Sequence, residues 1–472
     1  MDLDVMKKTI KKYATHHSDM IIKSLVAERY YKNKNDILFP DKSKEEDKEE
    51  NPLRNADNRI PSNFHSLLVN QKAAYMFTAP PLFDVGNNTA NKQIVDELGD
   101  RYAKTCKDLC INASNSTVSW LHYWINSDKK FEYGVIDSKQ IIPIWSTDLN
   151  KKLIGLLRIH DEVDELTGDK YTIYEYWNDT VCQAFRKKTS DTVDEGLQAY
   201  SMFYQFVEDT QTGEMVNTYQ HGLGRVPFIP FFNNNVGTSD LDNIKSLIDT
   251  YDKVYSGFVN DLEDIQEIIF ILSGYGGTDL KEFIQDLKKY KAIKVDGDDG
   301  SGVSSLTINI PVEAREKLLT ITRKAIFEQG QGVDPQPESF GNASGVALKY
   351  LYSLLSLKAG LMETEFRLAF GEFVRAICQY IGVECKSIIQ TWTRTAITND
   401  TELADIAQKS QSVISKKTIV KNHPWVKDPE KEIQQIEEED KIPESDMINQ
   451  NKKDIETNHN DKKQVMDGAA NK

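Results

Sequence analysis

The chain has 472 residues, of which 39% are hydrophobic and 10% aromatic, and its formal net charge is −15. This composition supplies enough apolar surface for buried cores and excludes an intrinsically disordered protein. The excess of acidic residues excludes a basic clamp for nucleic acid, because tight phosphate binding needs clustered Lys and Arg.

The first half of the chain is predicted to contain helices followed by a sheet. Residues 1–35 have a helical spacing of apolar residues, whereas the charged stretch 41–51 is predicted to be a solvated loop. A loop at Ile60 leads into an apolar helix, and a further helix is predicted over about 91–112. From about 130 to 232, short runs rich in Tyr, Val, Ile and Phe alternate with turn residues, which predicts an antiparallel sheet region of about seven or eight strands.

The most regular pattern in the sequence is an apolar stripe over residues 239–272. Its apolar residues recur at alternating steps of three and four, which predicts a single helix of about nine turns and roughly 50 Å. Ser239 starts this helix and the glycine cluster at 274–277 ends it. The opposite face is rich in Asp and Glu. We therefore expect one side of the rod to pack against helices of this chain or of other copies, and a ring of such rods to enclose an acid-walled tube.

A small compact unit is predicted after this rod. It contains a short helix over 279–290 and two strands over 292–295 and 303–310. A return helix follows over 311–329, and a loop rich in Gly and Pro follows over 330–342. The small unit is therefore expected to be an excursion between two helices.

The last part of the chain is predicted to be helical. One long helix is expected over about 343–381, and a helical pair between about 400 and 440, where Ser415 caps a turn at 416–418. Beyond Pro443 the sequence offers few apolar anchors, so this tail is predicted to be disordered.

Catalytic and metal-binding motifs are missing from the sequence. It contains no GxxxxGK[ST] phosphate loop, no HExxH or HxH metal motif and no GxSxG nucleophile elbow. The glycine-rich stretch 221–227 does not open a helix, so we interpret it as a turn between strands. The five cysteines include no CxxC pair and are expected to be reduced, mostly buried thiols. We therefore expect no catalytic residue, metal or cofactor, and the sequence does not indicate an enzyme.

The sequence also lacks the signals of membrane insertion. Residues 1–12 have no apolar signal core, and no stretch approaches the roughly 18 apolar residues that a membrane span needs. We therefore expect a soluble chain that is made in a cytoplasm and contacts no membrane.

Short segments distributed along the chain carry a further signal in their order and spacing. They are Arg59-Ile60-Pro61, Asn63-Phe64, Lys72-Ala73-Ala74-Tyr75-Met76-Phe77, the block from His221 to Asn234, Ser239-Asp240-Leu241, Ile248-Asp249, Tyr251-Asp252 and Gly330-Gln331-Gly332-Val333-Asp334. Together these segments resemble the SPP1-type portal proteins of tailed bacteriophages, and the resemblance spans residues 55–440.

The resemblance implies an α+β, mainly helical portal fold that assembles as a ring, expected to be a dodecamer. The implied parts are a wing over 1–238, a stem helix over 239–272, a small α/β clip over 273–311, a returning stem helix over 312–329, a tunnel loop over 330–343, a wing segment with a long helix over 344–397, a helical crown over 398–442 and a disordered tail over 443–472.

The resemblance also implies a function and a set of partners. The ring would form the DNA channel at one capsid vertex and serve genome packaging, head–tail connection and genome ejection. The implied partners are other copies of the chain, double-stranded DNA, the terminase large subunit, a head-completion adaptor, and the major capsid and scaffolding proteins. The implied location is the portal vertex of the virion, after synthesis in the host bacterial cytoplasm.

Physical reasoning assigns candidate residues to these implied parts. An acidic stem wall would repel phosphate and keep DNA from sticking. Its residues are expected to be Asp249, Asp252, Asp261, Asp264 and Glu267. The tunnel loop would narrow the bore with Val333, Asp334, Pro335, Gln336, Pro337 and Phe340, while Gly332 and Gly341 would permit movement. Its apolar members, Val333 and Phe340, could equally pack against a neighbour.

Two further groups concern contacts at the ends of the channel. Weak contact with the DNA backbone is expected from Lys288, Lys291, Lys294, Arg323, Lys324 and Lys349, which could equally be ordinary surface or intersubunit charges. Docking of partners on the clip is expected at Tyr290, Ile293, Val295 and Leu306, which could instead pack subunit against subunit.

Two other classes of protein share some of these features. A capsid scaffolding or head-completion adaptor protein would have the same helix content and acidity, but it would not need a compact excursion between two helices. A DNA-acting enzyme would need a metal or nucleophile cluster, which the sequence does not offer. The portal interpretation accounts for more of the chain than either alternative.

Overall fold

The computed structural model describes residues 2–40, 56–200, 217–264, 269–273, 302–306, 311–336, 350, 352–394, 400–423, 426 and 429–439. The chain divides into two compact units. The first consists of Met1–Gln336 and Tyr352–Thr395, and the second of Pro337–Leu351 and Ala396–Lys472. The predicted loop 41–51, the predicted clip elements 279–290 and 292–295, and the predicted tail beyond Pro443 lie outside the described residues.

Helices dominate the beginning of the first unit. They are α1 (Leu3–Tyr31), α2 (Phe64–Met76), α3 (Asn88–Leu98) and α4 (Tyr102–Ser116), with the short η1 (Asp36–Leu38) after α1. The predictions for α1 and α2 are confirmed. The single helix predicted over 91–112 is wrong, because Gly99 ends α3 with a φ of 59°. Glycine adopts this left-handed conformation without a side-chain clash, and the chain restarts at Tyr102 as a second helix.

Two antiparallel sheets follow α4. One has the order β10-β2-β3, and the other has the order β4-β5-β6-β7-β8 with β9 paired to β7. The strands are β2 (Val118–Ile125), β3 (Phe131–Ile136), β4 (Ile141–Trp145), β5 (Leu153–Val163), β6 (Lys170–Trp177), β7 (Val181–Lys188), β8 (Gln198–Ala199), β9 (Thr218–Gln220) and β10 (Phe228–Phe232). The predicted sheet region is confirmed, although it begins at Val118. The stretch 221–227 connects β9 to β10, as predicted.

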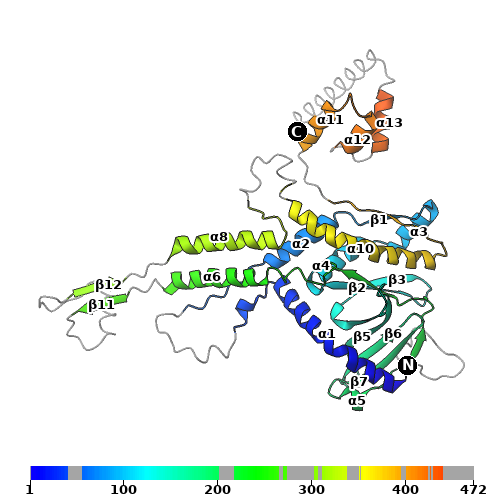
Figure 1. The fold of residues 1–472 in the computed structure, drawn as a ribbon, viewed down its shortest axis with the longest axis horizontal. Coiled ribbons are helices and arrows are strands. Elements are labelled where there is room, and N and C mark those ends of the chain that lie inside the picture. The colour runs from blue at the N-terminus through cyan, green and yellow to red at the C-terminus, as the bar shows by residue number, and fades with distance from the viewer. Residues whose placement is uncertain are drawn as a thin grey trace, which may run out of the picture. The chain divides into compact units, whose positions relative to one another are not determined.

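Helix α1 covers the larger sheet. Met6 and Ile10 of α1 share a buried cluster with Ile142, Leu157 and Tyr174 of the strands. Figure 1 shows α1 running alongside β5, β6 and β7. Short elements complete this region, namely η3 (Ser138–Gln140) and α5 (Val193–Gly196).

The main core of the first unit forms around the long helix α10 (Ser353–Tyr380). Phe366, Phe370 and Phe373 recur at steps of four and three on one face of α10 and are almost fully buried. The rings of Phe366 and Phe370 pack against Phe231 of β10 at 5.0 and 4.9 Å between centroids. Strand β1 (Leu82–Asp84) pairs with β13 (Ile389–Thr391). The helix predicted over 343–381 is confirmed from Ser353 onward.

Two helices in opposite chain directions project from this core. They are α6 (Lys245–Asp264) and α8 (Val312–Gln329), which lie side by side in Figure 1. Beyond them, β11 (Ile269–Ser273) pairs antiparallel with β12 (Gly302–Leu306). The return helix is confirmed as α8.

The single rod predicted over 239–272 is wrong at both ends. At the start, Ser239 Oγ donates to Asp242 Oδ1 at 2.9 Å, and the chain makes a turn before α6 begins at Lys245. At the end, Ile269–Ser273 is a strand rather than a helical turn. Ile, Phe, Ile and Leu follow one another there without a polar interval, and such a contiguous apolar run suits a strand.

The second unit contains α11 (Asp400–Lys409), α12 (Lys416–Asn422) and α13 (Pro429–Glu439). Ser415 accepts a hydrogen bond from the backbone N–H of Thr418 at 3.3 Å, so the predicted cap is confirmed. The turn predicted at 416–418 is instead the first turn of α12.

Candidate functional site

Polar side chains spaced four residues apart form a ladder along α6. Each accepts a hydrogen bond from a backbone N–H of the segment 56–62, which precedes α2. The bonds run from Ser62 N to Asp252 Oδ1 (2.9 Å), from Ile60 N to Ser256 Oγ (3.0 Å), from Asn58 N to Asn260 Oδ1 (2.6 Å) and from Ala56 N to Asp264 Oδ1 (3.0 Å). We call the acceptors Asp252, Ser256, Asn260 and Asp264 the α6 ladder.

The regular bonding of the α6 ladder is possible because the repeat of an extended chain and the repeat of a helix have nearly the same length. Alternate N–H groups of an extended chain point the same way and lie about 6.6 Å apart, at roughly 3.3 Å per residue. Residues four apart on a helix share a face and lie about 6.0 Å apart. The segment 56–62 can therefore place one N–H on each turn of α6, and α6 replaces the water that these groups would otherwise bind.

Asp252 does not fit the predicted channel wall. Its side chain is fully buried, with 0% exposed, and its Oδ2 accepts a hydrogen bond from Asn35 Nδ2 at 2.6 Å. Burial raises the pKa of this carboxyl, while the bonds from Asn35 and Ser62 lower it in part. The prediction for Asp252 is wrong, because the residue binds the N-terminal part of its own chain instead of facing an open space.

The remaining acids of the predicted wall are partly exposed but engaged. Asp249 accepts from Lys245 Nζ at 2.8 Å and from the hydroxyl of Tyr30. Asp261 forms an ion pair with Arg315 of α8, and Asp264 belongs to the α6 ladder. Glu267 lies outside the described residues. The negative face of α6 is therefore largely used for contacts inside the chain.

The apolar face of α6 is packed by its own chain mainly in its first part. Ile248 of α6, together with Leu241 and Ile244 just before it, is buried against α1, α2 and α8. Further along, Tyr255 and Leu262 are exposed, as are Leu318 and Ile321 of α8. Apolar side chains thus remain open on both projecting helices.

Arg323 of α8 was predicted to contact DNA, but the structure pairs it with the beginning of the predicted tunnel loop. Its Nε and Nη2 donate to Asp334 Oδ2 and Oδ1 at 3.0 and 2.7 Å. The guanidinium also lies over the rings of Phe64 and Phe327, at 5.9 and 5.3 Å from their centroids. Hydrogen bonding to Asp334 raises the pKa of Arg323 further. This bidentate pairing fixes the orientation of the guanidinium and occupies its Nε and Nη2 donors, so Arg323 is a poor candidate for phosphate contact.

The loop after α8 is fastened at a second point by Gln71 of α2. Gln71 Nε2 donates to the carbonyl oxygen of Val333 at 2.7 Å, and Val333 N donates to Gln71 Oε1 at 3.0 Å. The side chain of Val333 is buried. Together with the Arg323–Asp334 pair, these contacts fix the chain up to Asp334, whereas Pro335 and Gln336 are exposed.

Gly332 lies in a tightly packed position at the start of the loop. A Cβ atom at this position would lie 2.1 Å from Leu68 Cδ2 and 2.9 Å from Gln71 Oε1. Gly332 therefore allows the close approach of the loop to α2. Gly330 is similar, since its Cβ would lie 2.6 Å from Leu68 Cδ1.

Several predicted site residues lie outside the described residues. They are Lys288, Lys291, Lys294 and Lys349 of the DNA-contact group, Tyr290, Ile293 and Val295 of the clip group, and Pro337, Phe340 and Gly341 of the loop. Leu306 ends β12, where its Cα pairs with that of Ile269. Lys324 is 76% exposed in its side chain, with Glu328 at 3.7 Å one turn away.

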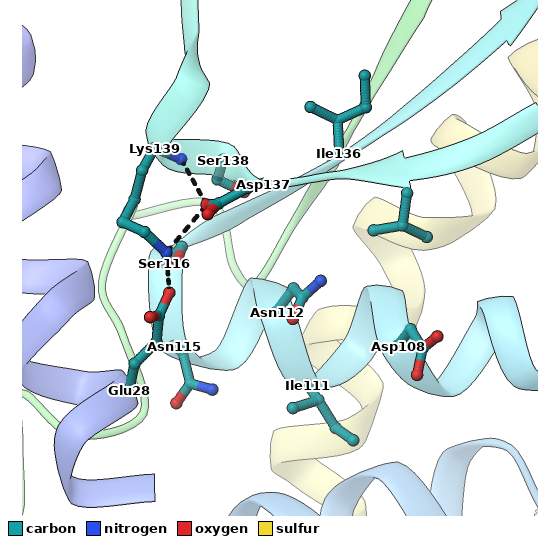
Figure 2. A pocket seen from close by; sticks show the side chains of 11 residues that line it. Glu28, Asp108, Ile111, Asn112, Asn115, Ser116, Ile136, Asp137, Ser138 and Lys139 are labelled. Carbon is teal, nitrogen blue, oxygen red and sulfur yellow. Dashed lines mark hydrogen bonds and ion pairs between the residues drawn. The ribbon is translucent and has the colours of Figure 1, made fainter. Parts of the chain in front are cut away.

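A cavity of about 390 Å³ lies between α1, α4, β3 and η3 (Figure 2). The ammonium of Lys139 lies at one end of the cavity. It forms ion pairs with Asp137 Oδ1, at 2.9 Å, and with Glu28 of α1. Burial disfavours this charge, but hydrogen bonds to Glu28 and Asp137 outweigh burial and raise the pKa of Lys139. The cluster joins α1 to η3.

Other chemical features can be stated for the described part of the chain. It holds no group of three or more His, Cys, Asp and Glu side chains placed to bind a metal. All five cysteines are free thiols, and all but Cys385 are buried, as predicted. Within the described helices, none combines the length and apolar character that a membrane crossing requires.

The sequence reasoning missed the acceptors Ser256 and Asn260, and it missed Gln71. The signal for the α6 ladder was present, since Asp252, Ser256, Asn260 and Asp264 recur at steps of four along the helix. No local pattern marks Gln71, because the backbone that it binds lies 262 positions away.

Comparison with known proteins identifies the class to which this fold and site belong. The model of the family described as phage portal protein, SPP1 Gp6-like, matches residues 10–443. The chain therefore belongs to the SPP1 Gp6-like family of phage portal proteins, and its function is that of a phage portal protein. The resemblance read from the sequence is confirmed. Portal proteins are structural components of the phage capsid.

Two portal proteins of other phages support this assignment. The chain is 42% identical over 459 residues to the portal protein of Clostridium phage phiCD119, in an alignment that covers 94% of this chain and 97% of that protein. It is 31% identical over 394 residues to the portal protein of Bacillus phage SPP1, covering 81% and 76% respectively. Among solved structures, it is similar to a chain in the neck of a native GTA particle computed with C12 symmetry, with a TM-score of 0.44, 12% identity, and coverage of 75% of this chain and 88% of that one.

Proposed function

We propose that this portal protein forms a closed homo-oligomeric ring of about twelve copies, through which double-stranded DNA enters and leaves the capsid. The observation that carries the proposal is the family match over residues 10–443, together with a portal relative that aligns over 97% of its own length. The exposed apolar side chains of α6 and α8 support it, since neighbouring copies in a ring would cover them.

The proposed parts of the ring follow the order of the elements. The paired helices α6 and α8 act as the stem, with the clip between them in the chain, including β11 and β12. The chain from Gly330 begins the tunnel loop, α10 belongs to the wing, and α11 to α13 form the crown. This assignment moves the beginning of the stem helix to Lys245 and its end to Asp264.

The proposed channel wall is less acidic than the sequence suggested. Asp249, Asp261 and Asp264 stay in the proposal with their charges partly neutralised by Lys245, Arg315 and backbone N–H groups. A wall of this kind holds DNA weakly, as a conduit requires. Lys324 remains the described candidate for transient phosphate contact, and Lys288, Lys291, Lys294 and Lys349 stay proposals outside the described residues.

The proposed partners are those of a channel at one capsid vertex. The clip would dock the terminase large subunit during packaging and a head-completion adaptor afterwards, at a surface that includes Leu306 and, outside the described residues, Tyr290, Ile293 and Val295. The wing would contact the major capsid and scaffolding proteins. Synthesis in the host bacterial cytoplasm precedes assembly into the virion.

Native mass spectrometry and end-on electron micrographs of the purified full-length protein test the ring. A closed particle of about twelve subunits with a central opening would support the proposal. A small oligomer that never closes, even with scaffolding protein added, would refute it and favour a scaffolding or head-completion adaptor role. Soaking the particles with a duplex of DNA at low salt would then show whether density enters the opening.

A further inference from the structure

A buried cluster near the start of α6 contains two lysines and one carboxylate. Lys72 of α2 and Lys358 of α10 lie 2.7 and 3.1 Å from the same atom, Asp240 Oδ2. The exposed fractions of the Lys72, Lys358 and Asp240 side chains are 1%, 11% and 5%. Asp240 Oδ1 accepts a separate hydrogen bond from Asn233 Nδ2 at 3.0 Å. The carboxylate is therefore shared between both ammonium groups.

The charges in this cluster do not balance. Among the neighbouring titratable groups, burial lowers the pKa of His65 to about 4 and raises that of the Cys110 thiol to about 11, so both are neutral at pH 7. The lysines flank Asp240 and hold its pKa low, which keeps it ionised. Burial lowers the pKa of Lys358, as expected where an ammonium is not fully compensated, whereas the attraction of Asp240 raises it in part. With both lysines protonated, two positive charges face one negative charge, and an uncompensated charge away from water is costly.

Each ammonium also has a donor to spare. Lys72 Nζ donates to Asn233 Oδ1 at 2.7 Å, and Lys358 Nζ donates to the carbonyl oxygen of Gly330 at 2.9 Å. With the ion pair to Asp240, each lysine has two partners among the described residues, but an ammonium carries three N–H groups. Both side chains line one cavity of about 250 Å³.

The cavity is otherwise suited to a small polar guest. Its lining includes the carboxylate of Asp240, the amide side chains of Asn234, Asn243 and Gln331, and the hydroxyl-bearing residues Thr238 and Ser239. Water could satisfy the spare donors, but it could not balance the charge. Because both nitrogens contact the same oxygen, they lie close enough for one anion to contact both.

We propose that this cavity binds a small singly charged inorganic anion, of which chloride is the simplest, between the ammonium groups of Lys72 and Lys358. The anion neutralises the cluster. It also holds the ammonium of Lys358 in place beside the carbonyl of Gly330, the residue that caps the C-terminal end of α8 and from which the loop towards Asp334 begins. Binding is therefore expected to stabilise the junction of α2, α8 and α10 in the assembled protein.

Thermal unfolding of the full-length protein tests this site. Sodium chloride is exchanged for sodium gluconate at constant ionic strength, because the hydroxyl groups of gluconate would have to lose their water in the cavity. The midpoint temperature is expected to rise with chloride and, above the dissociation constant, to keep rising with the logarithm of the chloride concentration, since a tenfold excess over the dissociation constant multiplies the folding equilibrium constant about elevenfold. General salt screening would act equally in both salts.

Two variants make the test specific. Lys358→Met leaves Lys72 and Asp240 as a neutral pair, so the difference between chloride and gluconate is expected to vanish. Lys317→Met removes an exposed lysine of α8 and should preserve the difference. An equal response to both salts in the natural protein, or a chloride response that persists in Lys358→Met, would overturn the proposal.

A structural measurement covers the case in which Lys358→Met does not fold. Crystals or frozen particles of the natural protein are prepared in sodium bromide, and the anomalous signal or density is examined between Lys72 Nζ and Lys358 Nζ. A bromide peak in contact with both nitrogens supports the site. Density for water alone at saturating bromide refutes it.

Discussion

Replacing Asp252 with alanine is expected to release the segment 56–62 from α6. The substitution removes the acceptor of Ser62 N and of Asn35 Nδ2 and leaves both donors buried. Each unsatisfied donor costs about 1–3 kcal/mol, so the local loss should be about 3 kcal/mol. Since 1.4 kcal/mol corresponds to a factor of ten, hydrogen exchange in the segment should accelerate about a hundredfold.

Asparagine at the same position separates the roles of charge and geometry. Asp252→Asn keeps one acceptor oxygen and therefore one of the two bonds. Burial raises the pKa of Asp252, which means that the negative charge itself is not favoured there. The acceleration of exchange in Asp252→Asn is therefore expected to be clearly smaller than in Asp252→Ala.

Hydrogen exchange measured by mass spectrometry, on peptides that cover 56–62, reads this effect directly. Lys253→Ala is the matched control, because Lys253 is the next residue on α6 and is exposed. Peptides from the larger sheet should exchange at unchanged rates in all variants. Unchanged protection of 56–62 in Asp252→Ala would show that the α6 ladder does not hold the segment, and the reasoning would be wrong.

Other consequences of the geometry can be measured separately. Gly332→Ala should lower stability by about 1–3 kcal/mol through its clash with Leu68, and adding Leu68→Ala should recover part of this loss in a denaturant titration. Arg323→Lys cannot pair in two-fold fashion with Asp334, so proteolysis near the loop should quicken, whereas Lys324→Arg should leave it unchanged. Burial lowers the pKa of His122 to about 3. Between about pH 6.5 and 3 the unfolded chain therefore binds a proton at this histidine and the folded chain does not, so the free energy of unfolding should decrease as pH drops through this range. His122→Phe should flatten this slope of unfolding midpoint against pH, and an unaltered slope would contradict the assignment.

Local patterns in the sequence were sufficient for much of the fold. The helical spacing of Leu241, Ile244 and Ile248 correctly predicted a packed face, because these side chains meet α1, α2 and α8. The same periodicity failed at Ile269, since a stripe can be extended by chance into an apolar run that forms a strand. The sequence also did not show that Gly99 ends a helix, because this depends on its positive φ.

The candidate site depended more on contacts between distant residues. The acids of α6 looked like a bare negative surface, because their partners in 56–62 lie about 200 positions earlier in the chain. Arg323 looked like a phosphate ligand until the loop placed Asp334 beside it. A sequence gives the charge of such groups but not which of them neutralise one another.

The spacing of alternate N–H groups in the segment 56–62 matches the spacing of residues four apart on α6 closely but not fully. The two repeats differ by about 0.6 Å per step, so the offset grows to about 2 Å across the three intervals of the ladder. Side chains can bend to absorb that much, but a much longer ladder would lose its register. A one-residue insertion in the segment would turn every following N–H away from α6, whereas a two-residue insertion would need four added residues in α6 to restore the pairing. The lengths of these two stretches are therefore expected to change together, in the ratio of one to two, if they change at all.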